Sequence, residues 1–519
     1  MQGTPDRLTP TTPLRRFAGR LLPPSAKETP VKYDQSKTPY LDALIRYRER
    51  GFTPFHTPGH KRGKGAPPKL IEALGRQLLD VDVAMAGGVE DTRESTGLVQ
   101  LAEEMAAEAW GAEQAWFLVN GSTSGLHALV MTTAGPGEHI ILPRNSHKSV
   151  LAALIFSGAM PHYVEPAIEE QWQIPLGVPN SRVARALKQL PQAKALVVTS
   201  PNYYGVCADL PGVADVVHAA GIPFIVDQAW GPHLRFCRHL PVDAMTAGAD
   251  AAVASVHKLI SGLTQSSILL ARGTHINLKR LASIVKMTQS TSPQVLMLVS
   301  IDAARCQMAT NGERLWHTAI ELAEWAREQI NTISGVRCLT RDVLQHEGAY
   351  AFDPTRLTIT ARDLGLSGYE LETVLRDDYG IAVEMAEPLN IVNNVTYGDS
   401  RADVKRLVGA LRDLAARYAD RGMSETLQHA RMLAMPRFTR QVMTPRDAFF
   451  APSVALPTEE CAGHIAAEIV TPYPPGVPVL GPGEEISTEI VAYLREGAAI
   501  GLHVHGPEDT SLRTLRVVR

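Results

Sequence analysis

The sequence contains few cysteines, and none of them is spaced as zinc-binding cysteines are. Five cysteines are scattered over 519 residues without a Cys-x-x-Cys pair. This usage gives no sign of a disulfide framework or a zinc site, and it is typical of proteins kept in a reducing compartment. We therefore expect a cytoplasmic protein without a bound metal.

Long apolar runs and an excess of positive charge are also missing. No apolar run reaches the ~18 residues that are needed to span a membrane. The N-terminal segment lacks the uninterrupted apolar core of a secretory signal. The 51 basic and 54 acidic residues leave a net charge of −3, whereas nucleic-acid-binding proteins usually carry a basic excess. We expect neither a membrane protein nor a nucleic-acid-binding one.

The composition that remains is that of a globular protein with a large core. Hydrophobic residues make up 45% and charged residues 20% of a chain long enough for several domains. Segment 1–30 is rich in Pro, Thr and Arg, which predicts a mobile arm or an extended strap, with a transit peptide as the alternative. Helical spacing follows at 40–51, and Pro and Gly then predict a loop at 52–68.

Strand and helix patterns alternate between residues 95 and 275. Helices are predicted at 97–111 and 121–135, and strands at 114–120, 251–258 and 266–272. A strand is followed by a polar loop at 139–149 and at 194–205, and a helix is followed by a strand at 213–231. Such alternation predicts an α/β fold in which helices cover both faces of a mostly parallel sheet. A smaller α/β unit is predicted to follow, with helices at 312–333 and 402–420, a strand at 349–363, and a helix followed by a strand at 367–387.

Polar residues gather where the predicted strands end. In parallel α/β sheets, functional groups collect at the carboxyl ends of the strands. Polar clusters occur in this position at Asn120–Ser124, Ser146–His147, Asn202–Tyr204, Asp227–Trp230 and Ser255–Lys258. This arrangement favours one functional site along a single edge of the sheet.

The segment NGSTSG at 120–125 connects a predicted strand to a predicted helix. Backbone N–H groups at a helix N-terminus, with hydroxyl groups beside them, bind anions such as phosphate. The same residue types also serve as simple helix caps, so the motif alone leaves both interpretations open. It matches neither the Walker loop nor a GxGxxG motif.

Three further residues point to a cofactor. Asp227 ends an apolar strand and either caps a turn or pairs with the protonated nitrogen of a ring. His147 is either a packed residue or a stacking platform for a planar ligand. Lys258 is either a surface lysine or a desolvated one, whose lowered pKa lets it form a Schiff base. A phosphate seat, a carboxylate for a ring nitrogen and a Schiff-base lysine together describe a pyridoxal-phosphate site.

A series of motifs extends this prediction along most of the chain. They are TPGHKRG, FLVNGSTSG, RNSHKS, SPNYYG, VDQAW, SVHKLISGLTQSS, TSPQ and PYPPGVPVLGPGE, in that order. Together they resemble the ornithine, lysine and arginine decarboxylases, which are fold-type I pyridoxal-phosphate enzymes with an aspartate-aminotransferase-like fold. The resemblance is to the short form of the family, which lacks an N-terminal receiver-like domain.

The resemblance implies a domain plan. An N-terminal arm and helix would occupy 1–50, and a large domain with a mostly parallel sheet would bind pyridoxal 5′-phosphate within 51–310. A smaller α/β domain would span 311–430, and a C-terminal decarboxylase-type domain would span 431–519. The chain would act as a homodimer or as an assembly of dimers.

The resemblance also implies roles for single residues. Lys258 would bind the cofactor, Asp227 would pair with its ring nitrogen, and His147 would stack on the ring. Ala229 would lie against the other face of the ring, and Trp230 would line the same wall. The phosphate would be bound by Gly121, Ser122, Thr123, Ser255 and His257, and by the partner subunit's Ser290 or Thr291.

The implied reaction removes CO2 from a basic amino acid (arginine, lysine or ornithine) and leaves a polyamine-type amine. Lys258 or His257 would return a proton to Cα. Glu384 matches an acidic position on the substrate side, although a solvated glutamate at a strand end is the alternative.

Other outcomes stay open at this stage. An aminotransferase, a lyase, an amine-forming oxidase or a non-catalytic regulatory homologue would use the same fold. Aminotransferases carry an arginine for the substrate carboxylate in the small domain, and the sequence does not place one. Short-form members often read VDEAHGAH where this chain reads VDQAWGPH, so Gln228 and Trp230 leave the substrate open.

Overall fold

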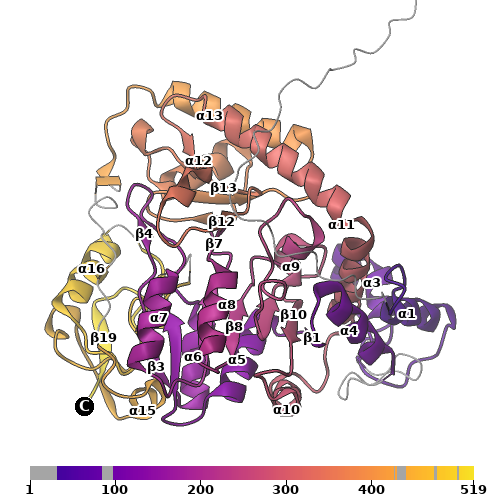
Figure 1. Ribbon diagram of the computed structural model, residues 1–519. Helices are drawn as coiled ribbons and strands as arrows, with labels where there is room; N and C mark the ends of the chain where they lie inside the picture. The colour runs from indigo at the N-terminus through magenta and orange to yellow at the C-terminus, as the bar shows by residue number, and fades with distance from the viewer. Residues whose placement is uncertain are drawn as a thin grey trace, which may run out of the picture. The chain divides into compact units, whose positions relative to one another are not determined.

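The computed structural model describes residues 32–84, 97–425, 427–428, 436, 440–472, 476–499 and 502–519. Its centre is a seven-stranded sheet with the order β1-β10-β9-β8-β6-β2-β3 (Figure 1). The strands are β1 (Gln114–Leu118), β2 (His139–Pro143), β3 (Met160–Val164), β6 (Leu196–Thr199), β8 (Phe224–Asp227), β9 (Ala251–Ala254) and β10 (Ser267–Ala271). β10 pairs antiparallel with β1 and β9, whereas the pairs from β9 to β3 are parallel. The predicted mostly parallel sheet is confirmed.

Both faces of this sheet are buried because successive side chains of a strand point to opposite sides. In β8, Phe224 and Val226 join one hydrophobic core, and Ile225 joins the other. The first core contains side chains of α1 (Pro39–Glu49), α4 (Gly97–Trp110), α7 (Asn180–Gln189), α8 (Leu210–Ala219) and α11 (Val295–Ile330). The second contains side chains of α5 (Gly121–Thr133), α6 (Lys148–Ser157) and α10 (Leu278–Thr288).

A second, antiparallel sheet lies beyond the first along the chain. Its order is β11-β13-β15-β14, formed by β11 (Arg337–Cys338), β13 (Arg356–Thr360), β15 (Ile391–Asn394) and β14 (Met385–Ala386). Its core includes side chains of α12 (Gly368–Tyr379), α13 (Arg401–Arg417) and the end of α11. The expected boundary at residues 310–311 falls inside α11. Trp316 and Ala319 still belong to the first core, and Leu322 to the next.

The predicted strand at 349–363 is two separate strands. β12 (Ala351–Phe352) pairs with β7 (Val206–Cys207) next to the large sheet, whereas β13 belongs to the small sheet. Pro354 lies between them, and proline has no N–H to continue a ladder. This break links the two sheets and brings Arg356, the first residue of β13, near the large one.

The C-terminal part has its own small core. The elements of this part of the chain are α15 (Pro445–Phe450), β16 (Ser453–Pro457), β17 (Thr471–Pro472), α16 (Thr488–Ala499), β18 (Val504–His505) and β19 (Thr514–Val518). The Pro/Gly-rich segment 471–487 contains β17 and the residues between β17 and α16. Residues 473–475 lie outside the described part, and Val477, Val479 and Leu480 are buried. Arg144 Nη2 donates to Glu484 Oε2 at 2.8 Å, and this buried ion pair ties the segment to the end of β2.

Short elements complete the description. They are α2 (Pro68–Leu74), α3 (Arg76–Val81), α9 (Val256–Leu259), β4 (Ile168–Glu169) and β5 (Ile174–Pro175). Residues Gln35–Arg519 form one compact unit, and Met1–Asp34 are assigned to another, most of which lies outside the described residues. Within the described residues, no helix is long and apolar enough to cross a membrane.

Candidate active site

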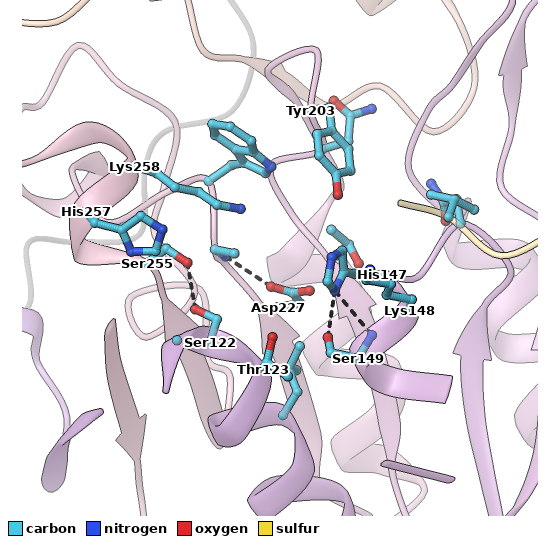
Figure 2. Close-up of a pocket in the computed structure, with 18 of the residues that line it drawn as sticks. Ser122, Thr123, His147, Lys148, Ser149, Tyr203, Asp227, Ser255, His257 and Lys258 are labelled. Atoms are coloured by element: carbon cyan, nitrogen blue, oxygen red, sulfur yellow. Dashed lines mark hydrogen bonds between the residues drawn. The ribbon is translucent and has the colours of Figure 1, made fainter. Parts of the chain in front are cut away.

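A cavity of about 510 Å³ opens at the carboxyl ends of β6, β8 and β9. The N-terminal ends of α5 and α6 form part of its wall. Most of the predicted site residues line this cavity: Gly121, Ser122, Thr123, His147, Asp227, Ala229, Trp230, Ser255, His257 and Lys258. These residues come from four separate segments of the chain, and Figure 2 shows the labelled ones gathered around one space.

Lys258 lies in α9, the short helix that directly follows β9. Burial lowers the pKa of its side chain from 10.5 to about 8, although the nearby Asp227 carboxylate partly opposes this change. Its Nζ lies 4.1 Å from the centre of the Trp230 ring. A lysine that loses its proton near neutral pH is a nucleophile toward carbonyl carbons. The surface-lysine alternative does not describe this enclosed side chain.

Asp227 is the last residue of β8, and only 3% of its surface is exposed. Its Oδ1 accepts a hydrogen bond from the backbone N–H of Ala229 at 3.1 Å. Burial raises the pKa of the carboxyl group, and the charge of Lys258 and the Ala229 N–H partly offset the rise. A buried carboxylate of this kind favours a cationic ligand group next to it.

His147 caps the N-terminus of α6. Its Nδ1 accepts from the backbone N–H of Ser149 at 3.2 Å and lies 2.8 Å from the hydroxyl of the same residue. Burial, together with the positive charge of Lys258, lowers the pKa of the imidazole to about 3. The ring is therefore neutral and held in one orientation at the cavity wall, as a stacking surface requires.

Three serine hydroxyl groups meet at the start of α5. The Oγ of Ser122 lies 2.8 Å from that of Ser255 and 2.6 Å from that of Ser267. The helix begins at Gly121, whose φ of +66° suits glycine. The first turn of a helix leaves backbone N–H groups without intrahelical acceptors, so the region is an anion seat. Ser267, in β10, was not predicted.

His257 faces this seat from α9 (Figure 2). Its Nδ1 lies 2.7 Å from the backbone carbonyl oxygen of Ser266. A carbonyl oxygen only accepts, so Nδ1 carries the proton in this contact and Nε2 is left as the second polar atom of the ring. Burial lowers the pKa of His257, which favours the neutral ring.

Two buried polar atoms of the cavity wall have no partner among the described residues. They are the Oγ1 of Thr199 and the indole Nε1 of Trp230. Thr199 stands directly opposite Asp227 in the pairing of β6 with β8. Buried polar atoms without partners are uncommon in proteins and are typical of sites that bind a polar ligand. Together with the lysine, the carboxylate and the hydroxyl seat, they fit pyridoxal phosphate.

Three predicted site residues lie outside this cavity. Ser290 and Thr291 are exposed and line a separate cavity of about 350 Å³ next to the end of α10. Glu384 lies beside α12 on the wall of a third cavity, and Asn394 Nδ2 donates to its Oε2 at 3.0 Å. Partial enclosure raises the pKa of Glu384, while the charges of Arg356 and Lys258 oppose the rise. Within one chain, none of the three residues lines the cavity around Lys258. Glu384 is nevertheless close enough for its carboxylate to interact electrostatically with Lys258.

Gln228 and Arg356 both lie close to Trp230, and the structure gives the contacts of each. The amide of Gln228 is buried outside the cavity, where it donates to the Gly231 carbonyl at 3.0 Å and accepts from the Ala244 N–H at 2.5 Å. It is a structural residue. Arg356 is fully buried, donates to the Trp230 carbonyl at 3.1 Å and lies 4.5 Å from the centre of its ring. The small sheet therefore places an arginine against Trp230, although Arg356 itself does not line the cavity.

The fold and the site together define a pyridoxal-phosphate enzyme of fold type I. A solved lysine decarboxylase from Francisella novicida matches with a TM-score of 0.79 and 20% identity over 92% of this chain and 80% of that one. A serine palmitoyltransferase from Sphingomonas wittichii matches with a TM-score of 0.52 and 17% identity over 69% of this chain and 86% of that one. These similarities establish the predicted fold class.

The chain belongs to the Orn/Lys/Arg decarboxylase family. The family's major domain matches residues 38–403, and its C-terminal domain matches residues 426–508. An arginine decarboxylase from Bacillus subtilis (strain 168) is 39% identical over 93% of this chain and 98% of its own length. The inducible lysine decarboxylase of Escherichia coli (strain K12) is 25% identical over 93% of this chain and 80% of its own length. The chain is thus a pyridoxal-phosphate-dependent decarboxylase of a basic amino acid, as predicted.

Proposed function

We propose that this chain decarboxylates arginine. The observation that carries the substrate is the difference in similarity among its relatives. Four bacterial proteins named arginine decarboxylase are 38–40% identical to it over 86–94% of the chain. Proteins named lysine decarboxylase are 25% identical to it.

The cofactor, when bound, supplies an electron sink for the pair released as the bond between Cα and the carboxylate breaks. Lys258 holds the cofactor, and its lowered pKa lets the amine react at physiological pH. Asp227 keeps a proton on the ring nitrogen by placing a buried negative charge beside it. The neutral ring of His147 would stack on one face of the cofactor ring, and Ala229 would lie against the other. After CO2 leaves, Lys258 or His257 donates a proton to Cα.

The polar groups where α5, β9 and β10 meet would hold the phosphate group. Gly121, Ser122 and Thr123 contribute the first turn of α5, and Ser255 and His257 contribute polar groups from the end of β9. Ser290 and Thr291 are exposed outside this pocket, so in a homodimer the partner subunit's Ser290 or Thr291 would complete the seat. This arrangement makes the dimer the active unit.

Glu384 is proposed to bind the guanidinium end of the substrate. A carboxylate accepts two parallel hydrogen bonds from a guanidinium group. The charge of Glu384 already interacts with Lys258 and Arg356, so a substrate fixed near Lys258 can extend toward it. Arg356 holds the backbone of Trp230, and we assign it to the pocket wall and not to binding the departing carboxylate.

The product would be a guanidinium-bearing amine, which suits a role in polyamine formation. We also propose a cytoplasmic location, which the five free cysteines support because such thiols persist in a reducing compartment. The expected domain plan of a large, a small and a C-terminal domain is retained as part of this proposal.

The decisive experiment measures release of labelled CO2 from carboxyl-labelled arginine, lysine and ornithine. The purified chain is supplied with pyridoxal phosphate, and keto acid formation is followed in parallel. Arginine should give at least about tenfold higher kcat/KM than the other two, because a site that hydrogen-bonds a polar group of its substrate discriminates against substrates that lack it. Faster turnover of lysine or ornithine would overturn the substrate assignment.

The matched variants are Lys258→Ala and Lys194→Ala. Lys194 forms an exposed ion pair with Glu138 away from the cavity, so its replacement removes a lysine without touching the site. Lys258→Ala should lose the visible absorbance of the bound cofactor and about 10³-fold or more of the activity. Retention of both properties by Lys258→Ala would overturn its role.

A further inference from the structure

A second cluster of polar groups lies at the other ends of the strands that carry the site. His218 is in the last turn of α8, Asp250 directly precedes β9, and His275 is in the segment between β10 and α10. His218 Nε2 lies 3.0 Å from Asp250 Oδ2, and His275 Nδ1 lies 2.9 Å from Asp250 Oδ1. The three ligand-type atoms all lie within 4.8 Å of one another.

Asp250 is the buried centre of this cluster. Only 3% of its surface is exposed, and its Oδ2 also accepts from the backbone N–H of Phe224 at 2.8 Å. Its backbone N–H and carbonyl are bonded to Phe224 and Arg272, so the carboxylate has a fixed position. A buried carboxylate requires a compensating positive charge, which either a protonated imidazole or a metal ion can supply.

The two imidazole rings are arranged to share one ligand. They are stacked at 5.0 Å between centroids with 19° between their planes, and each presents one nitrogen to the carboxylate. Both side chains remain partly open to solvent, with relative exposures of 34% and 26%, so an ion can enter from the surface. Among the described residues, these are the three His, Cys, Asp or Glu side chains that lie close enough together to hold a metal ion.

We propose that His218, Asp250 and His275 bind one divalent transition-metal ion, with Zn²⁺ as the representative. Two imidazole nitrogens and one carboxylate oxygen form a ligand set that zinc accepts, with water in the remaining position. Calcium and magnesium prefer oxygen ligands only, which this set does not provide. Zinc bonds of ~2.0–2.1 Å in a tetrahedron separate neighbouring ligand atoms by about 3.3 Å. The two His–Asp distances of 3.0 and 2.9 Å have to open slightly, and no two of the three ligand atoms are more than 4.8 Å apart.

The site is structural because of its place on the sheet. β8 and β9 carry Asp227 and Lys258 at or just beyond their carboxyl ends, and the cluster lies at their amino ends. A bound ion would join α8, β9 and the segment after β10 without contacting the cofactor pocket. The ligands are separated by 32 and 25 residues along the chain, which no short motif reveals. The proposal is independent of the arginine assignment.

The test uses the cofactor-loaded enzyme after removal of metals with EDTA. The protein is equilibrated with Zn²⁺ and passed through a desalting column, and its zinc content is measured by mass spectrometry. The wild-type chain should retain one additional Zn²⁺ per chain relative to His218→Ala and His275→Ala, and its thermal midpoint should rise with added Zn²⁺. Affinity in these variants should fall about a hundredfold or more, since loss of an outer partner alone costs 10–100-fold.

His239→Ala is the matched control. His239 also lies next to a second histidine, with 5.2 Å between its ring centre and that of His317, so the control removes a comparable surface imidazole. It should retain zinc like the wild-type chain, and this comparison also subtracts any zinc that the cofactor itself binds. The visible absorbance and circular dichroism spectrum establish that each variant is folded. Equal zinc content in wild type, His218→Ala and His239→Ala would overturn the proposal, as would an absence of bound zinc in all three.

Discussion

The ammonium group of Lys258 lies 4.1 Å from the centre of the Trp230 ring. The negative face of an indole ring attracts a cation, by about 0.5–2 kcal/mol depending on how far the pair is desolvated. Burial acts in the opposite direction and lowers the pKa of Lys258 to about 8. The Trp230 ring thus holds the protonated form of Lys258 in place, and the lowered pKa lets that proton leave close to physiological pH.

The pKa of Lys258 sets the pH dependence of cofactor capture by the cofactor-free enzyme. Only the neutral amine attacks the aldehyde, and a pKa lowered to about 8 means that the neutral fraction grows as pH rises through 8. The covalent capture rate should rise about tenfold per pH unit below 8 and level off above it. Stopped-flow absorbance after mixing with pyridoxal phosphate measures this rate. A rise that continues unchanged to pH 10 would show that the lysine has an ordinary pKa.

Replacing Asp227 by asparagine tests the buried carboxylate without changing its size. Asp227→Asn removes the negative charge that favours protonation of the ring nitrogen, so kcat should fall about 100-fold or more. The phosphate seat is untouched, and the variant should still bind cofactor. Asp215→Asn on the exposed side of α8 makes the same chemical change and should leave kcat unaltered. Near-normal turnover by Asp227→Asn would contradict the assigned role.

The role of Glu384 is tested by Glu384→Gln. Loss of the charge should raise the KM for arginine about tenfold with a smaller change in kcat, because a charged hydrogen bond to the substrate tail contributes about 1.5–3 kcal/mol. Glu372→Gln is the control, since Glu372 lines the same cavity but is paired with Arg376. If both variants have the same KM, Glu384 is a solvated residue outside the substrate path.

The buried pair of Arg144 and Glu484 predicts a large loss of stability. Their side chains are 2% and 1% exposed, so Arg144→Ala removes the guanidinium charge beside a carboxylate that stays buried. Such a loss destabilises a protein by about 3–5 kcal/mol, whereas breaking an exposed pair costs about 1 kcal/mol or less. The comparison is with Lys194→Ala, which breaks the exposed pair with Glu138. Denaturant unfolding at one fixed pH measures both, and equal midpoints would show that the buried pair contributes little.

The residues that could be predicted from the sequence stand at the ends of apolar strands. Asp227 and Lys258 follow runs whose pattern indicates a buried parallel strand, and such strands bring their carboxyl ends to one edge. His147 and Ser122 were found in the same way. Each strand pattern and the polar residue that follows it are neighbours in the sequence, so these residues could be predicted without the structure.

The residues that were missed reach the site through pairing between distant strands. Ser267 is the first residue of β10 and Thr199 the last of β6, and a single hydroxyl residue at a strand end is common in β-sheets without any ligand. Arg356 comes from the small sheet and is brought to Trp230 only by the break at Pro354. The sequence pattern predicts a helix from residue 312, whereas α11 begins at Val295. The first turns of α11 are apolar, and the sequence gives no sign that they continue into the predicted helix. Sequence spacing alone cannot supply these long-range contacts.

Helix α11 has a consequence for how the protein unfolds. Its 36 residues form a continuous rod about 54 Å long, with Trp316 in the core of the large sheet and Ala326 in that of the small one. Neither core can lose its section of this helix without exposing apolar side chains and unpaired backbone groups at the junction. The two sheets should therefore melt in one cooperative transition, with the helix transmitting the loss of one core to the other.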